Sequence, residues 1–156
     1  MYICLLINND HYDTYLNELF FTNRITRFED SNSSNIKVFS TQFYLQLKEF
    51  GPEAVQSWTE KKNIDVFEKK FVVIPIGKSL HWILVVIVNP GHLPMYFRDG
   101  VGNPFLLILD SSPFLNYNKI RDKLSSWLRR EGLRLQKFSN NDDLNERELP
   151  MLKPEG

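Results

Sequence analysis

A histidine and an aspartate at the ends of two apolar segments are the residues of this 156-residue chain best suited to acid–base chemistry. His81 opens the apolar run 81–88, and Asp110 closes the run 105–110. An aspartate that accepts a hydrogen bond from one imidazole nitrogen fixes the tautomer of the ring and leaves the other nitrogen to act as a base. The simpler alternative is that both residues only terminate strands.

The spacing of this pair allows a direct geometric test. If the two runs are neighbouring antiparallel strands, the start of one lies opposite the end of the other. Pairing His81 with Asp110 sets a register in which Ile83 faces Ile108. Directly opposed residues point to the same face of a sheet with their Cβ atoms close together. In that register the imidazole and the carboxylate are expected within hydrogen-bond reach.

The elements that position the pair are predicted to be short strands buried on both faces. The runs 71–76, 81–88 and 105–110 are apolar, rich in β-branched residues and bounded by Gly, Pro and Asn. The segment 89–104 between the last two runs is long for a hairpin connection and rich in Gly and Pro, so we predict a loop there.

Helical spacing of apolar residues predicts helices over 15–28, 40–47 and 118–131, with a further helical turn over 52–59. The residues expected on their buried sides are Phe43, Tyr44, Leu47, Trp58, Ile120, Leu124, Trp127 and Leu128. The residues expected to bound the helices are Ser40 and Asn118 as N-caps and Gly132 as a terminator. The alternating segment 133–138 predicts one more strand.

Composition predicts one intracellular domain, in the nucleus or the cytoplasm, that binds neither nucleic acid nor a membrane. Acidic and basic residues balance at 19 each, and Cys4 is the single cysteine, which fits a reducing compartment. The first residues lack the features of a signal peptide, and no apolar run approaches a membrane span of about 20 residues. We predict a domain over 1–138 and a polar, disordered tail over 139–156.

Five segments, in order and at matching spacing from about residue 12 to 138, resemble those of the Ulp/SENP family of cysteine proteases, which process and remove SUMO-type modifiers. They are Tyr-Leu-Asn-Glu at 15–18, Val-Phe-Ser-Thr-Gln-Phe-Tyr at 38–44, Val-Gln-Ser-Trp-Thr at 55–59, the block 65–76 with Leu-His-Trp at 80–82, and Leu-Ile-Leu-Asp-Ser at 107–111. The family counterparts read Trp-Leu-Asn-Asp, Phe-x-Ser-x-Phe-Tyr, Val-Arg-Arg-Trp-Thr, a strand–turn–His-Trp block and a strand that ends in the catalytic Asp.

The resemblance implies an α+β, papain-like cysteine protease fold, incomplete here, with N-terminal helices packed on a small central mixed or antiparallel sheet. It implies that His81 is the general base and Asp110 its orienter. Trp82 corresponds to one of the aromatics that clamp the diglycine tail of the modifier. Tyr15 stands at the other clamp position, which is normally Trp, and Asn17 belongs to the same substrate-binding segment. The implied partners are SUMO, or another ubiquitin-like modifier ending in Gly-Gly, and its conjugates; no cofactor or metal is expected.

The sequence departs from the family after residue 138. The family places a glutamine that helps hold the oxyanion, and then Asp-Cys-Gly, downstream of the strand that 133–138 resembles, and nothing here matches. Gln136 lies within that predicted strand, and Cys4 is a poor substitute nucleophile because it sits in an apolar run at the other end of the chain. His11 and His92 have no partners at metal-ligand spacing.

Three hypotheses follow for the function. The first is an inactive fragment of a SUMO-type cysteine peptidase that keeps the base and its orienter and lacks the nucleophile. The second is a non-catalytic module that binds SUMO or a ubiquitin-like modifier. The third is an unrelated α+β domain. The sequence leaves open which modifier is recognised, and whether precursors or conjugates are processed.

Overall fold

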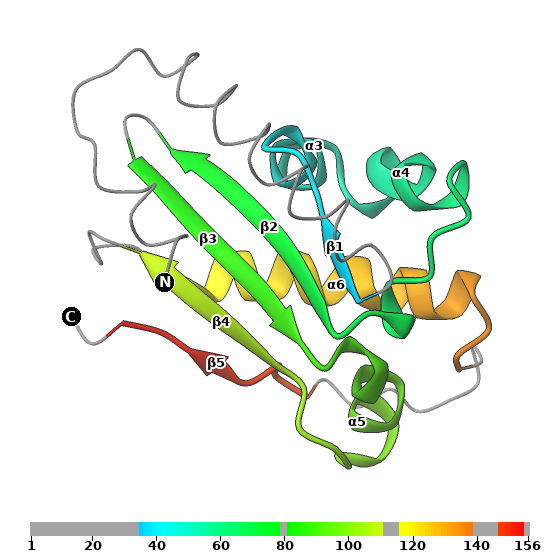
Figure 1. Ribbon diagram of the computed structural model, residues 1–156. Coiled ribbons are helices and arrows are strands. Elements are labelled where there is room, and N and C mark those ends of the chain that lie inside the picture. The colour runs from blue at the N-terminus through cyan, green and yellow to red at the C-terminus, as the bar shows by residue number, and fades with distance from the viewer. Residues whose placement is uncertain (1–34, 79–80, 111–115, 139–146, 155–156) are drawn as a thin grey trace.

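A computed structural model gives the structure of the chain (Figure 1), and it describes residues 35–78, 81–110, 116–138 and 147–154. The predicted helix over 15–28 lies outside these residues, as do Cys4, Tyr15 and Asn17. In the described part of the chain, no helix has the length and apolar character needed to cross a membrane.

The described chain is built on one mixed sheet of five strands in the order β1-β2-β3-β4-β5. The strands are β1 Ile36–Val38, β2 Phe71–Lys78, β3 His81–Val88, β4 Phe105–Asp110 and β5 Met151–Leu152. The outer strands β1 and β5 run parallel to β2 and β4, whereas β2, β3 and β4 are antiparallel to one another. The three central strands are those that the apolar runs predict, and that prediction is confirmed.

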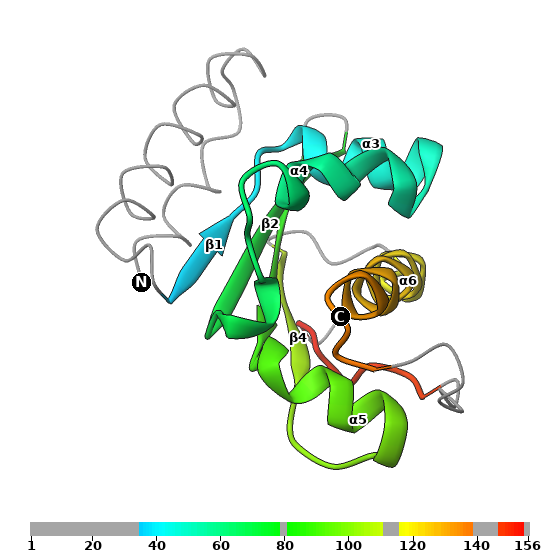
Figure 2. The ribbon, with the colours of Figure 1, turned by 90° about the vertical axis from the view of Figure 1, so that its right-hand side faces the viewer.

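The helices gather on one face of this sheet, as Figure 2 shows for α3, α4, α5 and α6. The helical elements are α3 Gln42–Phe50, η1 Pro52–Val55, α4 Gln56–Glu60, η2 Val66–Glu68, η3 Pro90–His92, α5 Leu93–Asp99 and α6 Asn118–Arg134. The layers confirm the expected class, helices packed on a small central mixed sheet.

Alternation along the strands gives the sheet two apolar faces. The helix-covered face carries the main core, which includes Ile74, Ile76, Ile83, Val85, Leu106 and Ile108. The other face carries a second buried cluster of Val38, Val73, Leu84 and Val86. Strands that are apolar on both faces fit the continuous apolar runs in the sequence, since alternation shows only where one face meets water.

Helices α3 and α6 contribute the side chains that the helical spacing predicts. Phe43, Tyr44 and Leu47 of α3 are buried, as are the four predicted residues of α6. Phe43 stacks on Phe39 and meets Trp127 edge-on, with ring centroids 4.0 and 4.8 Å apart. Trp58 differs from the prediction, since it lies half-buried at the rim of this cluster. The N-cap of α3 is Thr41 rather than the predicted Ser40, although Ser40 Oγ accepts a bond from the backbone N–H of Gln42 at 3.3 Å.

The region after α6 differs most from the prediction. Gly132 does not end the helix, and the strand predicted over 133–138 is wrong, because α6 continues to Arg134 and turns follow. A Cβ atom on Gly132 would lie 2.4 Å from the ring of Phe138, so this glycine is needed for close packing. At the other end, Asn116 rather than Asn118 supplies the cap, its Oδ1 accepting from the backbone N–H of Asn118 at 2.9 Å.

Two segments predicted to lack regular structure contain some. The predicted loop 89–104 holds η3 and α5, each with a proline in its first turn, where the missing N–H costs no helical hydrogen bond. Residues 147–154, within the predicted disordered tail, include β5 and the fully buried Leu149, so the expectation of disorder fails for them. The predicted domain boundary at 138 stays a prediction.

A buried polar cluster joins α4 to α6. Glu131, almost fully buried, accepts hydrogen bonds from Thr59 Oγ1 at 2.9 Å and from Arg134 Nη2 at 2.8 Å. A buried carboxylate is tolerated only when such donors replace water.

We therefore expect Glu131→Ala to lower the free energy of unfolding by about 2–4 kcal/mol, because it breaks a buried ion pair and leaves a cavity. The matched control is Glu53→Ala, which removes the exposed partner of Arg130 and is expected to cost less than about 1 kcal/mol. Urea unfolding measures both. Equal costs for the two variants would contradict this account of the cluster.

Candidate functional site

His81 and Asp110 meet at one end of the central strands, on the helix-covered face. In the observed register Asp110 lies opposite Ile83, so the predicted direct pairing of His81 with Asp110 is wrong by two residues. A shift of one residue would turn a side chain to the other face, whereas a shift of two keeps it on the same face. The two side chains therefore meet diagonally across the strand pair.

The contact itself is a hydrogen bond between His81 Nε2 and Asp110 Oδ1. The Asp110 side chain has no exposed surface, whereas 26% of the His81 side chain is exposed. The buried carboxylate fixes the imidazole from one side, and Nδ1 is left as the ring nitrogen that can take a proton. The predicted contact is confirmed, and the catalytic roles of the two residues stay a prediction.

Tyr117 binds the second oxygen of the same carboxylate, and the sequence reasoning missed it. The Tyr117 hydroxyl donates to Asp110 Oδ2 at 2.6 Å. Burial, the hydrogen bond to Asp110 and the charge of Asp110 all raise the pKa of this phenol. A signal was present in the sequence: Tyr117 lies three residues before Ile120, in line with the buried stripe of α6.

Trp82 lies on the face of the sheet opposite His81, as its neighbouring position in β3 requires. It is half-buried and pairs directly with Gly77 of β2. A Cβ atom at Gly77 would stand 3.1 Å from the indole ring, so the glycine leaves room for the ring to lie against β2. The predicted contact of Trp82 with a modifier tail stays a prediction, and so do those of Tyr15 and Asn17, which lie outside the described residues.

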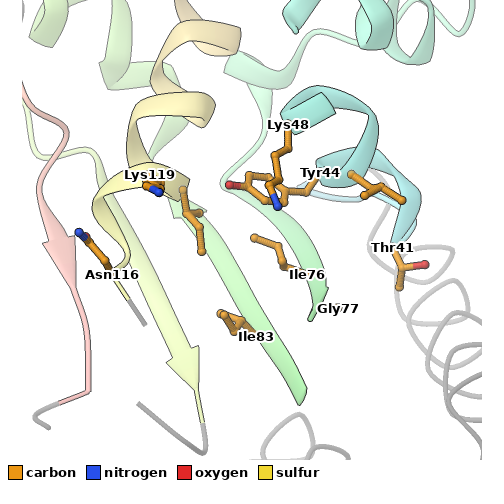
Figure 3. Close-up of a pocket in the computed structure, with 10 residues that line it drawn as sticks. Thr41, Tyr44, Lys48, Ile76, Gly77, Ile83, Asn116 and Lys119 are labelled. Atoms are coloured by element: carbon orange, nitrogen blue, oxygen red, sulfur yellow. The ribbon is translucent and has the colours of Figure 1, made fainter. Parts of the chain in front are cut away.

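A hollow of about 290 Å³ lies on the same face as the pair, between α3, β2, β3 and the start of α6 (Figure 3). Its lining residues are Thr41, Tyr44, Leu45, Lys48, Ile76, Gly77, Ile83, Asn116, Lys119 and Ile120. Ile83, which is paired with Asp110, lines its apolar part, so the hollow adjoins the dyad. Within the described ranges, no three His, Cys, Asp or Glu side chains gather in a way that could hold a metal ion.

Comparison with known proteins shows the family of this chain. Residues 6–151 match the Ulp1 protease family, C-terminal catalytic domain. The chain belongs to the Ulp1 protease family. The alternative of an unrelated α+β domain is therefore wrong. The match agrees with the family resemblance that implied roles for His81, Trp82 and Asp110.

Two relatives illustrate the match within the Ulp1 family. A probable ubiquitin-like-specific protease 2A of Arabidopsis thaliana is 37% identical over 91 residues, which cover 58% of this chain and 12% of that protein. The Sentrin-specific protease 2 of Homo sapiens is 36% identical over 81 residues, which cover 52% of this chain and 13% of that protein. The alignments thus span about an eighth of the length of these relatives.

Solved structures of Ulp1-type proteases share the fold. A structure described as the de-sumoylating protease matches with a TM-score of 0.63 and 22% identity, covering 95% of this chain and 54% of that one. The C-terminal Ulp1 protease domain in complex with Smt3, the yeast ortholog of SUMO, matches with a TM-score of 0.53 and 20% identity, covering 76% and 47%. The papain-like fold is therefore shown, and the chain spans about half the length of these solved chains.

Burial of Tyr44 beside this site predicts a dependence of stability on alkaline pH. Burial raises the pKa of Tyr44 from 10.0 to about 12. Because the folded-state pKa lies above the unfolded value, the stabilisation by the neutral phenol is complete below pH 10 and is lost as the pH rises toward 12. Urea unfolding across this range should show a steeper loss of stability for the unchanged protein than for Tyr44→Phe. Parallel curves would contradict the prediction.

The packing of the Trp82 indole ring against Gly77 can be tested separately. We expect Gly77→Ala to push the indole ring away from β2 and thereby to shift the emission of Trp82, measured in a variant whose other tryptophans are replaced by Phe. The distance of 3.1 Å requires a shift of only a few tenths of an ångström, so we expect a small loss of stability. An unchanged emission spectrum would show that Gly77 does not seat the ring.

Proposed function

We propose that this chain carries the base, the orienter and one tail-contacting aromatic of a SUMO-specific cysteine peptidase or isopeptidase. The observation that carries the proposal is the buried contact between His81 and Asp110 within a catalytic domain of the Ulp1 family. The proposed partners are SUMO, or another ubiquitin-like modifier with a Gly-Gly C-terminus, and its conjugates. The proposed place of action is inside the cell, in the nucleus or the cytoplasm.

In this proposal His81 takes the proton of the nucleophile through Nδ1. Asp110 holds Nε2, so the ring cannot turn away, and it stabilises the imidazolium that forms. Transfer of the proton to His81 gives a thiolate, which attacks the carbonyl carbon of the second glycine of the modifier tail. The imidazolium gives the proton to the amine as its C–N bond breaks, which leaves a thioester. Water then hydrolyses the thioester, which frees the carboxylate of the modifier and restores the thiol.

The nucleophile for this step is not among the residues that match the family. Cys4 is the single cysteine in the sequence, and no cysteine follows Phe138. Since loss of a triad member leaves only weak residual catalysis, we propose that the chain as given does not hydrolyse its substrate. Strand β5 runs parallel to β4, so its C-terminal end points toward the sheet end that carries Asp110.

The alternative is a non-catalytic module that binds the modifier. The half-buried Trp82, seated on Gly77, favours it, because this contact surface does not depend on a thiol. By resemblance to the family, Trp82 contacts a tail without side chains, so the proposed recognition is again of a Gly-Gly terminus.

Catalytic competence is tested with SUMO that carries a C-terminal electrophile in place of the last carboxylate. We expect no adduct with the chain as given, and an adduct with a version extended through the next cysteine of its coding sequence. In the extended version His81→Ala should slow adduct formation by about 100-fold or more. An adduct with the unextended chain, or equal rates with and without His81, would overturn the proposed roles.

Binding is tested by titrating the folded chain with SUMO that ends in Gly-Gly and with SUMO that lacks these two residues. We expect binding only of the first, weakened at least about tenfold by Trp82→Ala. The control is Met95→Ala, an exposed apolar residue of α5 at the opposite end of the strands. Absence of affinity in a folded sample would exclude the binding module.

A further inference from the structure

We propose that Tyr117 is a positioning residue for the dyad: its hydroxyl holds Asp110 Oδ2, so that Oδ1 stays turned toward His81 Nε2 and Nδ1 is kept free of a proton. The catalytic meaning of this inference rests on the proposed function, whereas the geometry does not. Tyr117 follows Asp110 by seven residues and opens α6, outside every segment that the family resemblance matched.

The need for such a residue follows from the burial of Asp110. Its side chain has no exposed surface, so water cannot satisfy or restrain its two oxygens. The torsion that rotates a carboxylate is broad and roughly two-fold, so a donor at each oxygen helps to fix its orientation. Tyr117 places a donor at Oδ2. The distance of 2.6 Å is that of a charge-assisted O–H···O⁻ bond.

Tyr117 is itself held by a rigid element. It is 5% exposed and lies on the face of α6 that carries Ile120 and Leu124 into the core. Its backbone oxygen accepts from the N–H of Arg121 at 3.0 Å, within the first turn of the helix. The docking of α6 on the sheet therefore sets the position of the hydroxyl, and a side chain on a helix is placed more accurately than one on a loop.

The direction of the hydrogen bond is fixed as well. Burial and the neighbouring carboxylate raise the pKa of Tyr117, so the phenol keeps its proton and acts as a donor. The titratable groups that the hydroxyl faces are Asp110 from β4 and, through it, His81 from β3. Lys119 of α6 and Lys48 of α3 line the adjoining hollow. With Oδ2 occupied by the phenol, Oδ1 accepts the hydrogen bond that Nε2–H of the neutral imidazole donates, and this selects the tautomer whose Nδ1 is a base.

The rival explanation is that Tyr117 is a core aromatic whose hydroxyl bonds to the nearest acceptor. Both explanations predict burial, and both allow a loss of stability when the hydroxyl is removed. They differ in the state of His81. If the phenol only fills space, the tautomer of the imidazole does not depend on it.

The test is ¹⁵N NMR of the imidazole nitrogens in the full chain, at a pH at which the imidazole rings are neutral. The variant His81→Gln identifies which signals belong to His81. In the unchanged protein we expect one tautomer with the proton on Nε2. In Tyr117→Phe we expect both nitrogen signals to shift toward intermediate values, as the tautomers mix. The matched control is Tyr96→Phe, which removes a hydroxyl that donates to the backbone oxygen of Glu148 at 3.0 Å, and its His81 signals should stay unchanged.

Identical His81 signals in Tyr117→Phe and the unchanged protein would overturn the proposal, as would a proton on Nδ1 in the unchanged protein. If Tyr117→Phe fails to fold, fluorotyrosine at position 117 decides: it keeps the shape of the ring but makes the hydroxyl a stronger donor, so the His81 nitrogen signals should shift, and unshifted signals would overturn the proposal. Neither measurement uses SUMO, so a failure here is distinct from a failure of the proposed function.

Discussion

The structure depends on one buried carboxylate that must be bonded at both oxygens. Asp110 ends a central strand with its side chain closed off from water, and a charge in such a place is stable only when donors replace the lost hydration. His81 supplies a donor at Oδ1, and Tyr117 supplies a donor at Oδ2. Three elements, β3, β4 and α6, are thereby tied together at one end of the sheet. A base oriented by a carboxylate is the chemistry that this end of the sheet can perform.

The rest of the fold serves to hold that end of the sheet in place. Both faces of β2 and β3 are apolar, so these strands are anchored from two sides. Helix α6 brings the phenol to the carboxylate, and its far end is fixed by Glu131 and by the close contact of Gly132 with Phe138. On the opposite face, Gly77 leaves the space that Trp82 occupies. His81 and Trp82 are thus neighbours at the start of β3, with their side chains on opposite faces of the sheet.

The sequence predicted local features well because they depend on local chemistry. Apolar runs located the three central strands, and the spacing of Ile120 to Leu128 located the buried face of α6. Register was predicted wrongly by two residues, since it is set by packing across strands rather than by the ends of the runs. The faces of His81 and Asp110 were still right, because strand alternation has a period of two.

Other features depended on contacts far apart in the sequence. The role of Gly132 required knowledge of Phe138, and the buried Leu149 required knowledge of the core it enters. Tyr117 was missed because a tyrosine near a helix start is usually a core residue, and its partner became visible only when β4 and α6 were placed together. Family membership supplied what physics alone did not, the class of reaction in which such a dyad takes part.

The central claim is that Asp110 orients His81 so that Nδ1 is the basic nitrogen. Neutron diffraction from crystals of the chain grown at a pH where the imidazole is neutral tests this most directly, because it locates the proton. We expect a proton on Nε2, directed at Asp110 Oδ1, and a bare Nδ1. A proton on Nδ1 with Nε2 bare, or a ring turned away from Asp110, would contradict it.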